Sequence, residues 1–437
     1  MRIAVVGTGI AGSTAAYALS HRHQIVVYER EMRPGGHSHT VEIDYDGARI
    51  AVDTGFIVYN ELNYPGLTAL FEHLRVETLP TGMSFSVSAN GGRLEWMGGG
   101  QGAIETLNGV FAQRTNVVSI PFWLMLRDML RFNRQCVADR AAGQLRGLTL
   151  GDYVDSRGFS RRLIRDYLLP MGAAIWSTPV DRMLDFPAEN FVAFFDNHRL
   201  LHQQRPVWRT VRGGSARYVQ ALTRPFRDRI RLGAAVTGID RTRAGVVVTD
   251  SLGGSERYDQ VIIAAHTDQA LAMLRDPSAD ERAILGAIRY RPNAVYLHRD
   301  PKLMPKRRRA WAAWNFLRGN GRGEDGGDVA VTYWMNALQH IDSDRPLFVS
   351  LNPPFEPDAA LTFARFTCDH PQFDMAAFAA QGRLGLIQGL NRTWFCGAWS
   401  GYGFHEDGLR SGLAAAQALG GSIPWRTPDT VYAEAAE

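Results

Sequence analysis

The first thirty residues alternate short apolar runs with a glycine-rich turn. Residues 2–6 are apolar and largely β-branched, which is typical of a buried parallel strand. Residues 13–19 are rich in alanine and compatible with a helix, and residues 24–28 form a second apolar run that ends at Glu29. The pattern predicts a strand, a glycine turn, a helix and a strand followed by an acid, which is the order of a dinucleotide-binding βαβ unit.

The three glycines of the turn, Gly7, Gly9 and Gly12, each have a physical reason to be glycine. The first permits a tight turn, the second lets the backbone approach a pyrophosphate, and the third lets the helix pack closely on the strand. The helix that follows would offer unpaired N–H groups and a positive dipole to phosphates. Glu29 would accept hydrogen bonds from an adenosine ribose.

The chain between residues 79 and 204 carries many large apolar residues in segments such as 121–126 and 191–195. Apolar residues at helical spacing predict helices with a buried face, so we expect a helical insertion that caps the cofactor-binding part. An amphipathic helix is predicted over residues 216–222. Short apolar runs predict strands at 230–232, 235–239, 245–248 and 259–265, and strands and turns then alternate from 266 to 384.

Composition narrows the class of protein. The 437 residues favour two domains, and 45% hydrophobic with 21% charged residues is an ordinary globular composition. Lys and Arg number 48 against 44 Asp and Glu, a balance that argues against a nucleic-acid partner. The three separated cysteines, Cys136, Cys368 and Cys396, cannot form a disulfide framework. They suit a reducing compartment, and we expect a cytoplasmic protein without a transmembrane helix.

A second motif makes a resemblance specific. Glu29 is followed by Arg33-Pro-Gly35-Gly36-His37, and this spacing resembles the flavin amine oxidase superfamily, which includes monoamine and polyamine oxidases, protoporphyrinogen oxidase and the carotenoid desaturases. The resemblance implies FAD rather than NAD as the cofactor. It also implies an α/β fold, in which a Rossmann-like FAD-binding domain of the amine oxidase type is interleaved with an α+β substrate domain that carries the helical insertion.

The same resemblance implies a division of the chain and a set of cofactor contacts. The FAD-binding domain would comprise residues 1–78, 205–265 and 385–437, and the substrate domain residues 79–204 and 266–384. His37 replaces the usual second Arg of the motif, and Ala398 stands where the superfamily has an acid. The residues expected to hold FAD are Gly7, Gly9, Ile10, Ala11, Gly12, Glu29, Arg30, Gly35, Gly36, His37, Thr54, Gly55, Phe56, Val236, Gly397, Ala398, Gly408 and Leu409.

A narrower resemblance suggests the substrate. Residues 36–40, 52–60, 304–311, 333–336 and 403–408 are similar to a bacterial subfamily labelled only as FAD-dependent oxidoreductases. Its members are commonly encoded beside cyclopropane-fatty-acid-synthase-like methyltransferases. The association implies work on unsaturated or methylated fatty acyl chains, with such a methyltransferase as a candidate partner.

Lysine usage points in the same direction. Amine oxidases of the superfamily typically keep a Lys that hydrogen-bonds a water at the flavin, but this chain has only Lys302 and Lys306. The strand that would carry that Lys, Asn293–Leu297, has none. We therefore expect dehydrogenation or double-bond rearrangement of a fatty acyl chain rather than amine oxidation.

Three residues of the C-terminal motif, Tyr402, His405 and Glu406, are the candidates for acid–base catalysis, since this segment is expected nearest the flavin. His405 and Glu406 could instead cap the helix that follows them. Two other functions stay open: a flavin amine or polyamine oxidase, and a non-catalytic flavoprotein partner of a lipid methyltransferase.

Two charged or metal-ligating features have alternative interpretations. The basic run Lys306–Arg309, flanked by Trp311 and Trp314, is either a solvated turn or an interfacial patch that meets anionic lipid headgroups. The second interpretation would place the protein peripherally on the inner face of the membrane. His37 and His39 lack a third ligand nearby, so no metal is expected.

Overall fold

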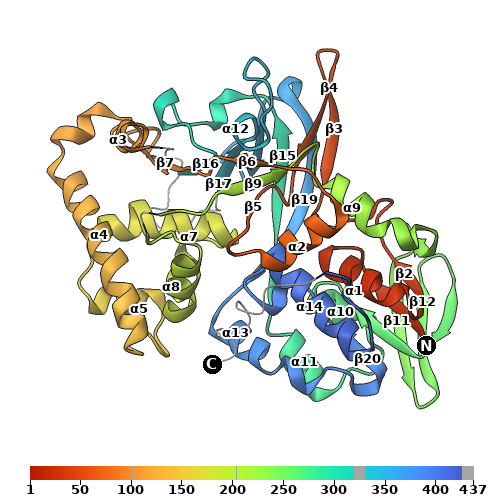
Figure 1. Ribbon diagram of the computed structural model, residues 1–437. Coiled ribbons are helices and arrows are strands. Elements are labelled where there is room, and N and C mark those ends of the chain that lie inside the picture. Colours follow the sequence, from red (N-terminus) through yellow and green to blue (C-terminus); the bar gives the residue numbers. More distant parts are fainter. Residues whose placement is uncertain (100–101, 203, 319–329, 426–437) are drawn as a thin grey trace.

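The computed structural model describes residues 1–99, 102–202, 204–318 and 330–425 (Figure 1). The dinucleotide-type half is built on a parallel five-stranded sheet in the order β10-β2-β1-β14-β20. Its strands are β1 (Arg2–Val6), β2 (Gln24–Tyr28), β10 (Ile230–Arg231), β14 (Gln260–Ile263) and β20 (Thr393–Phe395). The sheet confirms the predicted Rossmann-like core, since the central strands are continuous apolar runs buried by their neighbours.

Two helices from opposite ends of the chain pack together beside this sheet. Helix α1 (Ile10–Ser20) follows the glycine turn, and α14 (His405–Ala418) follows the C-terminal motif. A Cβ atom added to Gly412 of α14 would lie 2.1 Å from the carbonyl oxygen of Ala11, so only glycine permits this approach. The N-termini of both helices are thereby brought to the same end of the sheet.

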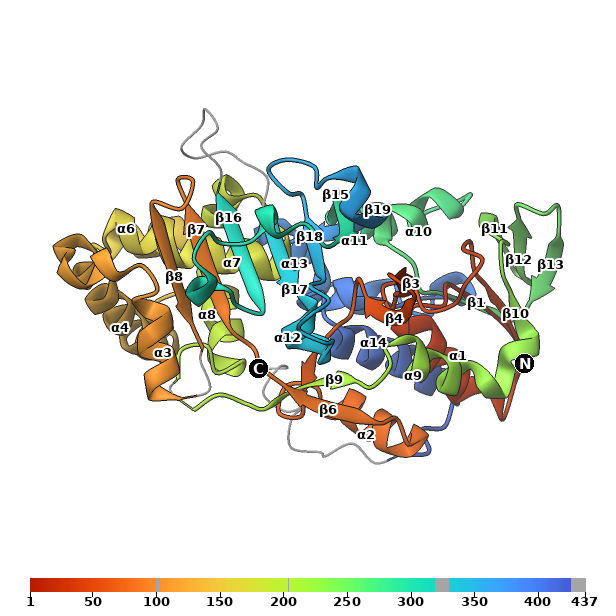
Figure 2. The ribbon, with the colours of Figure 1, turned by 90° about the horizontal axis from the view of Figure 1, so that it is seen from above.

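The second sheet has seven strands in the order β19-β15-β18-β17-β16-β7-β8, and all pairs are antiparallel except β16 with β7. Its strands are β7 (Phe85–Ala89), β8 (Leu94–Gly98), β15 (Arg289–His298), β16 (Trp314–Arg318), β17 (Ala330–Trp334), β18 (Phe348–Leu351) and β19 (Thr362–Gln372). It lies beside the first sheet, as Figures 1 and 2 show from two directions.

Three small antiparallel sheets complete the strand content of the described residues. They are the hairpin of β3 (Thr40–Tyr45) and β4 (Ala48–Asp53), the group β5 (Tyr59–Asn60), β9 (Trp208–Val211) and β6 (Thr78–Thr81), and the group β11 (Val236–Thr242), β12 (Gly245–Asp250) and β13 (Ser255–Tyr258). The strands expected near 235–239 and 245–248 are therefore present.

Helices fill most of the stretch from 79 to 204, but not its beginning. The helices are α3 (Ala103–Val110), α4 (Ile120–Ala141), α5 (Leu150–Ser156), α6 (Arg161–Leu163), α7 (Leu169–Trp176) and α8 (Ala188–Asn197). Residues 78–98 form β6, β7 and β8 instead. Strand β7 alternates apolar residues with Ser86 and Ser88, and the Ser86 hydroxyl donates to Asn315 on the neighbouring strand, so pairing with the sheet decides its conformation.

The remaining α-helices lie within the two halves or in the connections between them. They are α2 (Pro65–Leu74), α9 (Ala216–Thr223), α10 (Thr267–Met273), α11 (Ala279–Leu285), α12 (Met335–Gln339) and α13 (Met375–Gly382). Figure 2 places α3 and α4 at one end of the elongated molecule and β11–β13 at the other. None of the helices in the described part of the chain combines the length and apolar character that crossing a bilayer requires.

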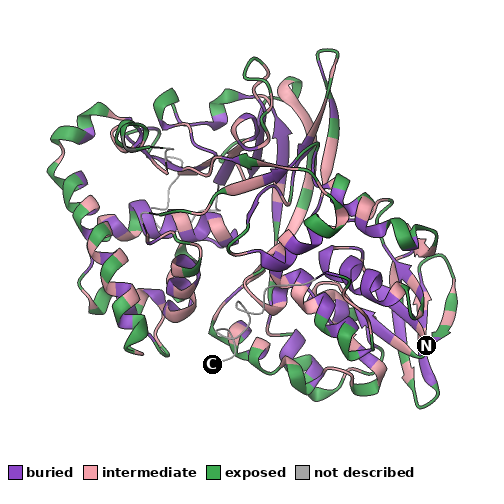
Figure 3. Ribbon diagram, viewed as in Figure 1, coloured by how far each residue is buried: buried purple, intermediate pink, exposed green. Residues whose placement is uncertain are grey.

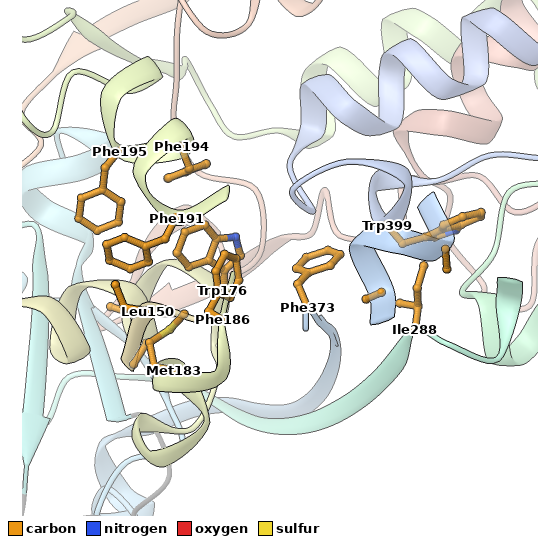
Figure 4. Packing of buried hydrophobic residues seen from close by; sticks show 14 of the residues in the cluster. Leu150, Trp176, Met183, Phe186, Phe191, Phe194, Phe195, Ile288, Phe373 and Trp399 are labelled. Atoms are coloured by element: carbon orange, nitrogen blue, oxygen red, sulfur yellow. The ribbon is translucent and has the colours of Figure 1, made fainter. Parts of the chain in front are cut away.

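The buried hydrophobic residues form three clusters, and the largest includes residues of both halves. Figure 3 shows buried segments in both halves. Under the helical insertion the largest cluster consists largely of aromatic rings: Trp176 lies 4.4 Å from Phe186 and Phe191 stacks on Phe195 at 4.1 Å, measured between ring centroids. Figure 4 shows this cluster with Phe373 to one side. Each such ring pair contributes about 0.5–1.5 kcal/mol beyond area burial, so the helical insertion has a stable base of its own.

Candidate functional site

The glycine turn between β1 and α1 has the shape expected of a pyrophosphate site. Gly7 has φ +101°, and a Cβ atom there would lie 2.5 Å from the carbonyl oxygen of Ala264. A Cβ atom on Gly12 would lie 2.0 Å from the carbonyl oxygen of Gly7, which shows why the helix needs glycine at this position. At Gly9 a Cβ atom would meet no protein atom within 4 Å. The protein therefore leaves space at Gly9, the position where a pyrophosphate is expected to approach.

Helix α1 begins at Ile10 with Gly9 as its N-cap and no side-chain cap. The first N–H groups of a helix have no partner within the helix, and they carry the positive end of its dipole. Ile10 and Ala11 line the adjacent cavity. This end of α1 fits an anionic phosphate group.

Glu29 directly follows β2 and is 7% exposed. Its Oε2 accepts hydrogen bonds from the Thr8 N–H at 2.9 Å and from the Thr8 hydroxyl, while its Oε1 accepts one from the Glu31 N–H at 2.9 Å. A carboxylate oxygen has two lone pairs, so Oε1 can accept one more hydrogen bond. Glu29 lines the cavity, and this free capacity suits a ribose hydroxyl.

The second glycine pair lies against the first turn. Gly35 and Gly36 have φ values of +115° and +56°, which favour glycine. A Cβ atom on Gly36 would lie 3.0 Å from the Cα of Gly9, and the Arg33 guanidinium donates to the Gly36 carbonyl at 3.1 Å. The two motifs identified in the sequence thus form one continuous wall.

A single cavity of about 2690 Å³ runs from this wall into the substrate half. The residues expected to hold FAD line it, except for Gly12, Gly35, Gly408 and Leu409. These four pack against other protein atoms, and their contact with FAD stays a prediction; a Cβ atom on Gly408, for example, would lie 2.8 Å from a methyl group of Ile10. Pockets for one drug-sized ligand measure roughly 300–1,000 Å³, so the cavity has room for a dinucleotide and a second large ligand.

His405 lines the cavity at the start of α14. Its ring stacks on Phe56 at 3.8 Å, and its Nε2 lies 3.0 Å from both the Ser38 Oγ and the Tyr218 hydroxyl. Burial lowers the pKa of His405 to about 3, so the ring is neutral and a weak base. A role of His405 in acid–base catalysis stays a prediction.

Glu406 does not line the cavity. Its two carboxylate oxygens accept hydrogen bonds from the Gly66 and Leu67 N–H groups, both at 2.9 Å, and so cap the N-terminus of α2. Burial raises the pKa of Glu406 to about 7. This position contradicts the predicted acid–base role of Glu406. The alternative prediction, that Glu406 caps the helix that follows it, is also wrong, because the helix it caps is α2.

The helix that follows, α14, is capped by Asp407. Its Oδ2 accepts hydrogen bonds from the Phe404 N–H at 2.9 Å and from the Tyr402 N–H at 3.1 Å. Tyr402 lines the cavity and packs against Phe194 and Phe378. Burial raises the pKa of the Tyr402 phenol, which therefore remains protonated and can donate a hydrogen bond.

Two histidines that the sequence did not single out lie beside His37. The ring of His37 is 5.8 Å from that of His370 and 6.1 Å from that of His266, and His266 stacks on Tyr290 at 4.3 Å. Burial lowers the pKa of both His266 and His370 to about 3. These histidines come from separate elements, so no local pattern links them. Within the described ranges no group of three His, Cys, Asp or Glu is arranged to hold a metal.

Beyond the glycine turns the cavity continues as an apolar arm between the helical insertion and the seven-stranded sheet. The apolar side chains that line the arm are Met83, Phe85, Met171, Ile175, Trp176, Trp208, Trp311, Trp314 and Tyr333, and Arg205, Arg308 and Arg309 also line the cavity. The described acids that line the whole cavity are Glu29 and Glu31 at the ribose end, Asp369 beside His370, and Glu105 on α3. Strand β15, the strand expected to carry the superfamily's Lys, presents Tyr290 and Val295 to the cavity.

The basic run is folded around a buried acid. The backbone N–H groups of Lys306 and Arg307 donate to the Glu95 carboxylate at 2.7 and 3.1 Å, and the Arg307 guanidinium pairs with it at 2.8 Å. The Arg308 guanidinium lies 3.7 Å above the ring of Trp311, which lines the cavity. Two of the four side chains of this run, those of Arg307 and Arg308, therefore make contacts within the protein.

The parallel sheet, the space at Gly9 and the two-part cavity define a dinucleotide-binding protein with room for a second ligand. The family comparison makes the class specific: residues 10–336 match the flavin-containing amine oxidoreductases, and the chain belongs to this family. FAD is therefore its cofactor, and the chain is placed among the FAD-dependent oxidoreductases. The turn, Glu29 and the helix end described above fit that cofactor.

Individual relatives differ in what they act on. AofH of Mycobacterium tuberculosis, named as a flavin-containing monoamine oxidase, is 28% identical over 296 residues, which span 63% of this chain and 59% of AofH. Among solved structures, putrescine oxidase bound to putrescine aligns with a TM-score of 0.67 at 15% identity, covering 96% of this chain and 99% of that one. A fatty acid isomerase from P. acnes that produces CLA aligns with a TM-score of 0.67 at 14% identity, covering 96% and 98%. At 14–15% sequence identity, these two solved structures show a shared fold alone.

Proposed function

We propose that the protein is an FAD-dependent oxidoreductase that acts on a fatty acyl chain, by dehydrogenation or by moving a C=C bond. The observation that carries the proposal is the apolar arm of the cavity, whose lining is rich in aromatic and thioether side chains. Each CH₂ buried in such an arm contributes about 0.8 kcal/mol, so an acyl chain gains affinity from length alone.

The same arm would bind a cationic amine poorly. Burying an ammonium group is costly unless a carboxylate or another acceptor pairs with it. The acids on the described lining lie at the ribose end, beside His370, or on α3 at the far end of the arm. The aromatic and thioether side chains between them favour a neutral, flexible chain.

The residues of this chain contribute position and the exclusion of water. Bound FAD supplies the two-electron acceptor for the reaction. The arm would hold the acyl carbon in place, and the neutral rings of His405, His266 and His370 would leave no mobile charge beside it. Tyr402 can donate a hydrogen bond from its phenol at the same wall.

Amine oxidation is the second candidate, because the family and AofH carry that name. The solved structures do not separate the two candidates, since a putrescine oxidase and a fatty acid isomerase align equally well. A third candidate is a non-catalytic flavoprotein that assists a lipid methyltransferase. The choice between them depends on what reduces the bound flavin.

The test is anaerobic mixing of the FAD-loaded protein with matched substrates. Dehydrogenation of detergent-dispersed phospholipids with unsaturated or methylated acyl chains should remove the oxidised-flavin absorbance. Movement of a C=C bond returns the hydride to the chain, and should instead be seen as a new bond position in the recovered acyl chains. Putrescine and cyclohexylamine should leave the flavin oxidised. Rapid reduction by the amines alone would establish the second candidate. Reduction by neither class, together with acyl chains recovered unchanged, would support the non-catalytic role.

A further inference from the structure

Exposed apolar side chains gather on the outer end of the helical insertion. The α3–α4 surface consists of Ile104 and Leu107 on α3, Val117 and Val118 on the short helix η1 (Arg114–Val118), and Ile120 and Trp123 at the start of α4. Val118 is 83% exposed, Ile104 79% and Ile120 73%. Figures 2 and 3 show these elements at one end of the molecule, with much of their length exposed.

This surface is unusual within the described part of the chain. Elsewhere the large exposed apolar residues, such as Leu252 and Leu386, are scattered in separate elements, which is normal for a protein surface. Six within twenty residues of each other form a patch, and such patches mark contact with a membrane or another protein. Helix α4 packs on the protein through its opposite face, where Phe122, Met125 and Phe132 are buried. Packing therefore does not explain the apolar residues on its exposed face.

The charge around the patch is basic. Segments 103–134 and 306–309 together contain eight Lys or Arg residues and two acids, Glu105 and Asp128. Asp128 is buried and pairs with Arg127 at 3.5 Å and with Arg131 at 3.8 Å, so the positive charge of the surface comes mainly from the other six basic residues. Arg309 and Lys306 are exposed on the adjoining turn. An apolar patch with a basic border complements a bilayer that contains anionic lipid.

The cavity reaches this same end of the molecule. Leu107 and Asn108 of α3 line it, as do Arg308 and Arg309 on the short helix η6 (Arg308–Ala310). All four residues are exposed, so the cavity meets solvent between α3 and η6. The opposite end of the cavity lies at Glu29 and Arg30, where FAD is expected.

We propose that the α3–α4 surface docks on a membrane containing anionic lipid and that acyl chains enter the cavity between α3 and η6. The docking stands on the exposed residues and their charge, whereas the entry of an acyl chain rests on the proposed function. The basic run Lys306–Arg309 then forms the border of the docking surface, and the apolar residues of α3, η1 and α4 form its centre.

The test uses the full chain loaded with FAD and sedimentation with vesicles of equal parts phosphatidylglycerol and phosphatidylcholine. The wild type should bind these vesicles, with binding weakened by salt and nearly lost on pure phosphatidylcholine. The affinity of the double variant Val118→Glu/Ile120→Glu for these vesicles should be lower than that of the wild type by about tenfold or more, since it places two negative charges at the centre of the surface. The matched control Leu252→Glu/Leu386→Glu changes exposed apolar residues elsewhere and should bind as the wild type does.

Retained FAD and an unchanged melting temperature show that each variant is folded. Failure of the wild type to bind, or equal binding by the two double variants, would overturn the docking. A dimer of the wild type that Val118→Glu/Ile120→Glu dissociates would assign the surface to a second copy and also overturn it. Vesicle binding needs no turnover: if the vesicles bind, no acyl chain reduces the flavin and no C=C bond is moved, the proposed function fails while the docking holds.

Discussion

Gly9 is the residue at which cofactor binding and folding separate most cleanly. A Cβ atom there meets no protein atom within 4 Å, whereas a Cβ atom at Gly12 would lie 2.0 Å from a carbonyl oxygen. Gly9→Val should therefore fold with a melting temperature near that of the FAD-free wild type but carry about a tenth of the FAD or less, because the side chain occupies the pyrophosphate approach. The ratio of FAD to protein measures this directly.

Gly382→Val is the control, since a Cβ atom at Gly382 also meets nothing within 4 Å and this residue lies away from the cavity. It should keep its full FAD content. Full FAD content in Gly9→Val would show that the cofactor does not approach this turn.

Glu29 is placed to bind the ribose and to hold the turn. Removing its carboxylate in Glu29→Ala should weaken FAD binding by about 1.5–3 kcal/mol, the scale of a hydrogen bond to a charged group. It should also lower the free energy of unfolding of the FAD-free protein by about 1–3 kcal/mol, because the buried Thr8 N–H loses its acceptor. Glu29→Gln keeps an acceptor and should show smaller losses. An unchanged FAD dissociation constant in Glu29→Ala would place the ribose elsewhere.

Glu406 gives a pH-dependent prediction. Burial raises the pKa of its carboxyl from 4.5 to about 7, so the folded protein holds this proton more tightly than the unfolded chain does. That contribution to stability is fully present below about pH 4.5 and is lost as the pH rises through about 7. The difference in free energy of unfolding, wild type minus Glu406→Gln, should therefore fall by roughly 2–3 kcal/mol across this interval. A flat or rising difference would contradict the assigned environment.

The same variant separates structure from chemistry. Because Glu406 lies on the N-terminus of α2 and off the cavity, folded Glu406→Gln should reduce its flavin with substrate nearly as fast as the wild type.

The glycine motifs could be predicted from the sequence because each glycine is required by contacts within a short stretch of chain. The contact of Glu406 with Gly66 could not, since it joins residues 340 positions apart. The histidines around His37 were missed for the same reason.

Helix α7 tests the apolar arm at the scale of an element. Ile175 lines the cavity from this helix, and its neighbour Trp176 belongs to the packed aromatic cluster. Ile175→Trp should fill part of the arm and shift the preferred acyl chain to shorter lengths, while Ile175→Leu, of similar volume, should keep the wild-type preference. Each CH₂ that no longer fits removes about 0.8 kcal/mol, about fourfold in KM.

The measurement is the dependence of KM on acyl length for the three proteins. If Ile175→Trp and the wild type prefer the same length, the arm between α7 and the seven-stranded sheet does not hold the chain. A loss of activity at every length, with FAD retained, would also contradict the assignment, since a shortened arm should still accept short chains.

Helices and strands could be predicted correctly from the local spacing of apolar residues where that spacing matches the buried face of the element. The strands around the glycine turn and the helices from 103 to 197 are as expected. Residues 78–98 are strands because β7 pairs with β16, more than two hundred residues away, and an apolar run alone does not reveal such a partner.

At the scale of the whole molecule, two sheets enclose one cavity with FAD expected at one end and an exposed apolar surface at the other. The sequence identified the FAD end through its motifs. It indicated the other end only through the basic run Lys306–Arg309, half of which the structure shows bound to Glu95 and Trp311. The division of the chain into residues 1–78, 205–265 and 385–437 against the rest remains a prediction.

The most direct test of the central claim is analysis of acyl chains after aerobic incubation of the FAD-loaded protein with phospholipid vesicles. The account predicts acyl chains that have lost two hydrogens or carry a C=C bond at a new position, seen by mass spectrometry of the released fatty acids. The products should disappear with Gly9→Val and persist with Glu406→Gln. Unchanged acyl chains, together with conversion of putrescine or cyclohexylamine to carbonyl products by the same preparation, would contradict it.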